Sequence, residues 1–259
     1  NKVSLNQAGA LVHVYTDGSV RLNHGGTEMG QGLFTKVAQV VSECFNIPID
    51  YVHISGTNTD EVPNTSATAA SSGSDINGMA AWKAATVIKQ RMLKHASKVF
   101  QKPPSSIEFK NGLILSGNKS MTFKELAFSC WENRISLSST GFYKTPKISW
   151  DQEKFKGSPY FYFTWGAAVS EAIIDIDTGE SRILRADIIQ DCGSSLNPLI
   201  DRGQIEGGFI QGIGWLTCEE LYFNPEGKLL TLGPSTYKIP GSRDVPPEFN
   251  IKLLENTPN

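Results

Sequence analysis

The chain contains 259 residues, with 24 basic and 26 acidic side chains and a formal net charge of −2. No stretch approaches the roughly 18 consecutive apolar residues of a membrane span, and balanced charge gives no bulk attraction to nucleic acid or anionic lipid. Five Trp, seven Tyr and 13 Phe residues argue against disorder. We therefore expect a folded globular protein that binds neither nucleic acid nor membranes.

Hairpins and helices are predicted to follow one another along the whole chain. In chain order they are a hairpin at 11–23, helices at 33–45 and 74–100, a hairpin at 107–115, a helix at 122–131, a hairpin at 172–187, a helix at 197–215 and a hairpin at 221–231. The hairpins rest on glycine-containing turns such as Asp17-Gly18, and the helices on apolar spacing and capping residues such as Thr122. Because there is no regular βαβ alternation, the expected fold class is α+β, with antiparallel hairpins and mixed sheets packed by helices.

Residues 133–165 have the loosest composition, and we expect a boundary between two subdomains there, 1–135 and 136–259. The chain opens without Met and stops straight after an apparent strand. We expect it to be a piece of a longer polypeptide, truncated at both ends.

Cysteine and histidine spacing predicts no transition metal held by protein side chains. No C-x-x-C and no H-x-x-x-H occurs, and the four cysteines lie far apart. These cysteines are expected to be buried thiols of a cytoplasmic protein.

Three predicted helices begin after unusual turns. The first turn, at 24–32, has four glycines in nine residues, so backbone N–H groups can approach a ligand closely. The second turn, at 63–75, offers small side chains and hydroxyl donors. The third lies at the start of the stretch 193–214, and the helix that follows it within this stretch carries Gly203, Gly207 and Gly208. Free N–H groups at a helix start favour an anion, and glycines within a helix indicate close approach of another element. The alternative is that these glycines serve turn geometry and packing alone; neither a P-loop nor a Rossmann fingerprint is present.

Four motifs carry a family resemblance: HGGTEMGQG at 24–32, PNTSATAASSGSD at 63–75, GSSLNPLIDRGQIEGGFIQGIG at 193–214 and GPSTYKIP at 233–240. In this order they resemble the molybdopterin domain of the xanthine dehydrogenase/aldehyde oxidase family, and the similarity covers essentially the whole chain. The form of the first two motifs is closest to the molybdenum-binding subunit of bacterial-type xanthine dehydrogenases.

The resemblance implies a molybdenum–molybdopterin cofactor, an anionic planar group whose own sulfurs hold the metal. Backbone amides and glutamines would grip it, which fits the missing metal-ligand clusters. Carried over by position, the cofactor-binding residues are Gly30, Gln31, Ala70, Ser71, Ser72, Gly73 and Gln204. Glu28 has no expected role beyond a turn contact or ion pair.

The resemblance also implies hydroxylation of purines such as hypoxanthine and xanthine, with electrons passing to [2Fe–2S] clusters and FAD on other domains or subunits of an oligomeric enzyme. NAD⁺ or oxygen would be the final acceptor. The family's catalytic glutamate, in a G-E-P-P-like motif, does not occur here, so no catalytic residue is assigned and the piece alone is expected to be inactive. Two alternatives stay open: an aldehyde oxidase or other N-heterocycle hydroxylase, and a non-catalytic assembly domain.

Overall fold

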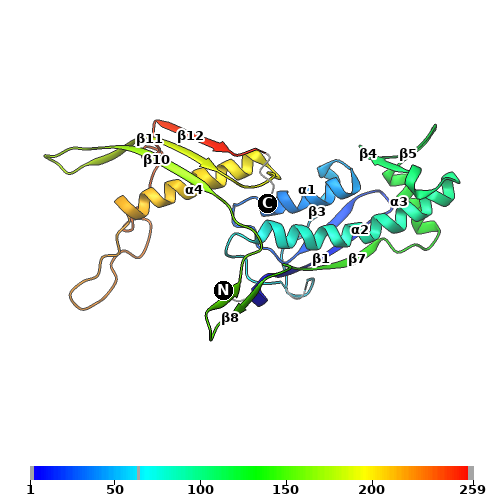
Figure 1. Ribbon diagram of the computed structural model, residues 1–259, viewed down its shortest axis with the longest axis horizontal. Helices are drawn as coiled ribbons and strands as arrows, with labels where there is room; N and C mark the ends of the chain where they lie inside the picture. The colour runs from blue at the N-terminus through cyan, green and yellow to red at the C-terminus, as the bar shows by residue number, and fades with distance from the viewer. Residues whose placement is uncertain (1–2, 63–64, 256–259) are drawn as a thin grey trace. The chain divides into compact units, whose positions relative to one another are not determined.

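The computed structural model describes residues 3–62 and 65–255, and the chain divides into two compact units, Asn1–Phe161 and Tyr162–Asn259 (Figure 1). Helices and sheets are mixed in both units, which confirms the α+β fold class.

The first unit is built around a four-stranded sheet in the order β3-β2-β1-β7. Its elements are η1 (Val3–Leu5), β1 (Gln7–Val14), β2 (Val20–His24), α1 (Leu33–Phe45), η2 (Ile49–Tyr51), β3 (Val52–Ile54), α2 (Gly73–Phe100), η3 (Pro104–Ser106), β4 (Glu108–Lys110), β5 (Leu113–Ser116), β6 (Lys119–Thr122), α3 (Phe123–Glu132), β7 (Ser138–Lys144), β8 (Ser149–Asp151) and β9 (Lys156–Ser158). β1 is antiparallel to β2 and β7, and β3 is parallel to β2. Strands β4–β6 and β8–β9 form two smaller antiparallel sheets.

The core of the first unit lies between the main sheet and helices α1 and α2, which run along it in Figure 1. Apolar side chains of β1 and β2, such as Val12 and Leu22, are fully buried there. The buried residues of α2 include several alanines beside larger side chains such as Ile88 and Met92. A Cβ added to Gly141 of β7 would lie 2.7 Å from the Ala84 backbone nitrogen. Because the helix and strand backbones approach so closely, only glycine fits at that position of β7.

The second unit has a three-stranded sheet in the order β10-β11-β12 and one long helix. Its elements are β10 (Gly166–Ile174), β11 (Ser181–Gln190), α4 (Pro198–Thr217) and β12 (Glu248–Leu253). β10 and β11 form an antiparallel hairpin, whereas β11 and β12 are parallel. α4 packs on β12 through Phe209 and Phe249, whose rings are 5.3 Å apart. β10 is exposed along its whole length.

The compact units divide after Phe161, within the stretch 133–165 where the composition placed a boundary. β7 belongs to the first unit because it pairs with β1 from His13↔Ser138 to Gln7↔Lys144. The subdomain limits 1–135 and 136–259 stay a prediction. The hairpin predicted at 221–231 forms in a short version: Phe223 and Leu229 make an antiparallel bridge, and the N–H groups of Asn224 and Leu230 donate to the carbonyls of Lys228 and Tyr222, but no longer strands are present. Tyr222 and Phe223 in this segment are exposed, so burial of their side chains does not stabilise longer strands.

Candidate functional site

The turn between β2 and α1 is organised by Glu28. Its carboxylate accepts hydrogen bonds from the backbone N–H groups of Gly30 (2.8 Å), Gly32 (3.0 Å) and Phe34 (2.9 Å). Burial opposes ionisation of this carboxyl, but these backbone hydrogen bonds outweigh it and lower its pKa. The N–H groups at the start of α1, which the sequence predicted to bind an anionic ligand, therefore bind the carboxylate of Glu28 instead. An acidic residue just before a helix start is the signal that could have revealed this role.

Gln31 lies in the same turn, and its side-chain amide is used within it. The Oε1 atom accepts a hydrogen bond from the Met29 N–H (2.6 Å), and the Nε2 group donates to the Thr27 carbonyl (2.8 Å). Gly30 has φ +100°, and a Cβ added to it would meet nothing within 4 Å. The tip of this turn, at Gly30, is therefore open.

The segment before α2 has an unusual backbone. Ala70 and Ser71 both have φ +57°, in the left-handed region that costs a residue with a Cβ about 1–2 kcal/mol. Both are exposed. Ser72 is the N-cap of α2, but its hydroxyl donates to the Ala69 carbonyl and caps no N–H of the helix. The N-cap side chain of this helix makes no capping hydrogen bond, although the Asp75 carboxylate in its first turn accepts the Ile76 N–H (2.8 Å). Strained backbone beside a helix start is typical of a ligand-binding segment.

The two turns lie against each other. The Thr27 N–H donates to Thr68 Oγ1 (2.8 Å), and a Cβ added to Gly25 would lie 2.5 Å from Thr65 Cγ2 and closer still to two other atoms of that side chain. The structure therefore brings the turn that carries Gly30 and Gln31 together with the segment Ala70–Gly73. We call these two segments, 25–32 and 65–73, the paired loops.

Below the paired loops, His24 and Asn77 are almost completely buried, with 3% and 2% of their surface exposed. His24 Nδ1 accepts a hydrogen bond from the Gly26 N–H (3.1 Å), and Asn77 Nδ2 donates to the Gly73 carbonyl (2.8 Å). Burial lowers the His24 pKa to about 4, although the nearby Glu28 charge acts in the opposite direction.

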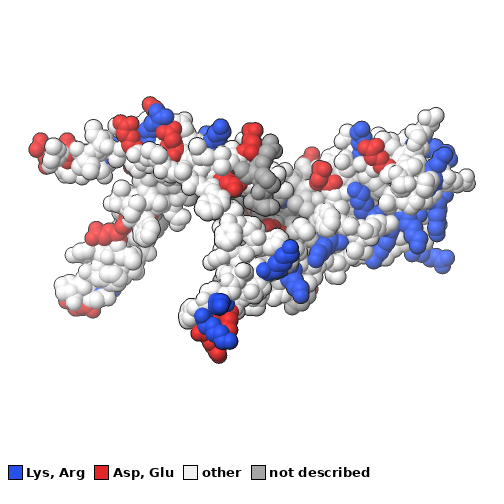
Figure 2. Space-filling model, viewed as in Figure 1, with Lys and Arg blue, Asp and Glu red and all other residues white. Residues whose placement is uncertain are grey.

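Neither loop contains a basic residue, since segments 25–32 and 65–73 include no Lys or Arg. Figure 2 shows Lys and Arg gathered instead over the end of the first unit that carries α3 and the second half of α2, where Lys94, Lys98 and Lys124 are exposed. Because the Gly30 and Gly32 N–H groups already bind Glu28, backbone N–H groups and hydroxyls for an anion remain mainly in the second loop, at 70–73.

The remaining predicted residue, Gln204, lies in the second unit on α4. Asn197 caps this helix by accepting a hydrogen bond from the Ile200 N–H (3.1 Å). Gln204 is exposed, and among the described residues no atom lies within 4 Å of a Cβ added to Gly203, Gly207 or Gly208. Within the described part of the second unit, therefore, nothing makes the close approach predicted for these glycines.

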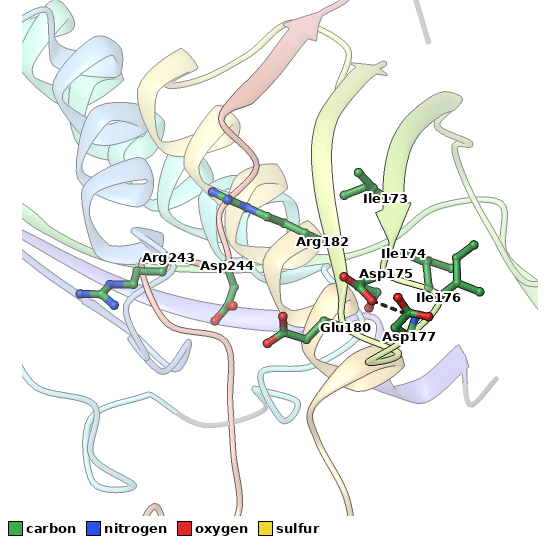
Figure 3. Close-up of a pocket in the computed structure, with 10 residues that line it drawn as sticks. Ile173, Ile174, Asp175, Ile176, Asp177, Glu180, Arg182, Arg243 and Asp244 are labelled. Atoms are coloured by element: carbon green, nitrogen blue, oxygen red, sulfur yellow. Dashed lines mark hydrogen bonds between the residues drawn. The ribbon is translucent and has the colours of Figure 1, made fainter.

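A hollow of about 640 Å³ lies at the tip of the β10–β11 hairpin, and none of the predicted cofactor residues line it (Figure 3). Asp175 faces Asp177 there and accepts hydrogen bonds from the N–H groups of Asp177 and Thr178, which fixes the turn. Within residues 3–62 and 65–255, no three His, Cys, Asp or Glu side chains come together as a metal-binding group. Of the described helices, none is long and apolar enough to cross a membrane.

Comparison with known families defines the class of the protein. The molybdopterin cofactor-binding domain matches residues 1–246, and the chain belongs to this family. Over 98% of its length it is 50% identical to xanthine dehydrogenase/oxidase of Felis catus, and over 99% it is 49% identical to xanthine dehydrogenase of Dictyostelium discoideum. It spans about 18% of the length of each of these relatives.

Among solved structures, quinoline 2-oxidoreductase from Pseudomonas putida 86 matches with a TM-score of 0.82 and 25% identity, covering 98% of this chain and 32% of that one. The resemblance carried by the four motifs is confirmed. Because the two relatives named above are eukaryotic, the closeness to bacterial-type enzymes stays a prediction.

Proposed function

We propose that this chain forms the molybdopterin-holding part of a xanthine dehydrogenase that hydroxylates hypoxanthine and xanthine. One observation carries the proposal: the two motifs shared with that family, far apart in the sequence, form the paired loops. The identity of about 50% to xanthine dehydrogenases supports the choice of substrate. The remaining polypeptide would supply the catalytic glutamate, because this chain offers no comparable residue.

The paired loops fit an anionic, planar organic group. The N-cap side chain of α2 makes no capping hydrogen bond, and Ala70 and Ser71 just before it have exposed side chains and left-handed backbone. A metal held by the group's own sulfurs would need no ligand from the protein. When bound, the cofactor supplies a molybdenum centre that accepts electrons from the substrate.

We assign roles to the predicted residues by their place in the loops. Ala70, Ser71, Ser72 and Gly73 would donate backbone and hydroxyl hydrogen bonds to the anionic group, and the open backbone at Gly30 would lie against its plane. Gln31 would hold its turn in shape and orient an amide toward the pterin. Gln204 would add one amide contact from α4.

The proposed enzyme passes electrons to [2Fe–2S] clusters and FAD outside this chain, with NAD⁺ or oxygen as the final acceptor, and acts in the cytoplasm as an oligomer. Four cysteines without disulfides agree with that compartment. Hydroxylation of another N-heterocycle is the second candidate, because a quinoline 2-oxidoreductase shares the fold over 98% of the chain.

Cofactor analysis of the full-length polypeptide tests the proposal. Protein purified from a molybdenum-replete host should contain molybdenum by mass spectrometry and release a fluorescent pterin on denaturation, and it should oxidise xanthine faster than quinoline or an aldehyde. Gln31→Ala should lower both contents, whereas Gln90→Ala, at an exposed position of α2, should not. Absence of molybdenum and pterin from the wild-type protein would refute the proposal.

A further inference from the structure

His24 links the end of β2 to the first of the paired loops. Its Nδ1 atom accepts the Gly26 N–H, so the proton of the neutral ring is on Nε2. That Nε2 atom is buried and has no hydrogen-bond partner among the described residues. The imidazole also packs against the ring of Phe34 in a T-shaped pair, with the ring centroids 5.1 Å apart.

Asn77 makes the corresponding link from the second loop. It lies one turn into α2, and its Nδ2 group donates to the carbonyl of Gly73, the first residue of that helix. The same Nδ2 atom would be 2.8 Å from a Cβ added to Gly26, so the amide lies directly against the backbone of the first loop. Its Oδ1 atom is buried without a partner in the described part of the chain.

Both side chains therefore converge on Gly26, one by a hydrogen bond to its N–H and one by contact with its Cα. A buried donor or acceptor without a partner usually costs stability, and apolar residues of similar shape would avoid that cost. Polar side chains at both positions therefore have to be explained by something other than packing. The bonds that they do make, to Gly26 and Gly73, set the backbone at the inner end of each paired loop.

We propose that His24 and Asn77 are a positioning pair that fixes the spacing between the first loop and the start of α2, and so shapes the paired loops for their ligand. The inference rests on the proposed function for the identity of that ligand. Neither residue is assigned contact with the cofactor; each acts through the loop backbone.

The variants His24→Asn and His24→Leu separate positioning from packing. An Asn at position 24 can still accept the N–H two residues later, as an Asx-turn does, but leaves unfilled volume. A Leu fills the volume and removes the acceptor. If His24 only packs, Leu should be tolerated better than Asn; if it positions the loop, the order is reversed.

The measurements are molybdenum and pterin content of the full-length protein, and amide hydrogen exchange of Gly26 in protein from a host that cannot make the pterin. We expect His24→Leu and Asn77→Asp to retain about five- to tenfold less cofactor and to exchange Gly26 faster by a similar factor, the size expected for one lost buried hydrogen bond. His24→Asn should stay near wild type. Ser116→Ala is the control: it removes a buried hydroxyl that also has no partner among the described residues but lies in β5, and it should change neither cofactor content nor Gly26 exchange.

Equal cofactor content and Gly26 exchange in His24→Leu and wild type would overturn the inference, as would His24→Asn behaving worse than His24→Leu. Failure of the proposed function is distinguishable, because the wild-type protein itself would then lack molybdenum and pterin. The Gly26 exchange rates would still test the positioning pair in that case.

Discussion

The contact between Gly25 and Thr65 provides a quantitative test of how the paired loops are joined. In Gly25→Ala the new methyl carbon would lie 2.5 Å from Thr65 Cγ2, whereas carbon atoms pack at about 3.5–4.0 Å. The loops would have to separate by about 1 Å, which strains or breaks the Thr27–Thr68 hydrogen bond. Overpacking and one lost hydrogen bond together predict a loss of about 2–4 kcal/mol in the free energy of unfolding.

Denaturant unfolding of the full-length protein measures this loss as a lower denaturant concentration at the midpoint, with an unchanged slope of the free energy of unfolding against denaturant. The cofactor content should fall as well. Gly56→Ala is the matched control, because a Cβ there meets nothing within 4 Å. Adding Thr65→Gly to Gly25→Ala removes the three clashing atoms and should recover most of the stability. A Gly25→Ala protein with wild-type midpoint and cofactor content would refute the proposed contact.

Four further changes have defined outcomes. Glu28→Gln keeps the shape of the side chain but removes the negative charge to which three N–H groups donate. It should lower the free energy of unfolding at neutral pH, measured by thermal unfolding, by about 1–2 kcal/mol. The His24 pKa is about 4 in the fold against 6.5 ordinarily, so the unfolded chain takes up this proton first. Stability that is complete above pH 6.5 should therefore fall by about 3 kcal/mol as the pH drops to 4; urea unfolding of His24→Asn should lack that component. Thr122→Ala removes the hydroxyl that accepts the Glu125 N–H and donates to the Glu125 carboxylate, while the backbone N–H of residue 122 can still donate to Glu125; it should cost about 1 kcal/mol by calorimetry. Gly141→Ala should cost about 1–3 kcal/mol in the same assay, because β7 would be pushed away from α2.

Local signals predicted the helices well. α1 begins and ends at the predicted residues, because apolar spacing agrees with a stop at Asn46, which adopts φ +53°. The capping box at Thr122 is present as predicted. Long-range pairing was not predictable in the same way: β7 joins β1 across more than a hundred intervening residues, and the parallel partner of β2 is the three-residue β3.

In the candidate site, too, some features were predictable from the sequence and others were not. The resemblance implied that these two turns and the segment 193–214 hold one cofactor, and the structure places the two turns in contact. The roles of Glu28, His24 and Asn77 depend on how the backbone coils after β2 and on the neighbouring start of α2. An acidic residue before a helix start indicates a role such as that of Glu28, but no local pattern of residue types encodes the geometry around His24 and Asn77, so these two side chains could be recognised only from the structure.

Amide hydrogen exchange at residues 70–73 tests most directly whether the paired loops hold the cofactor. Full-length protein from a molybdenum-replete host should be compared with the same protein from a host that cannot make the pterin, with helix α3 as the internal reference. We predict strong slowing at 70–73 and at 30–32 in the cofactor-containing protein and no change in α3. Equal exchange at 70–73 in a protein that demonstrably contains the cofactor would contradict the assignment.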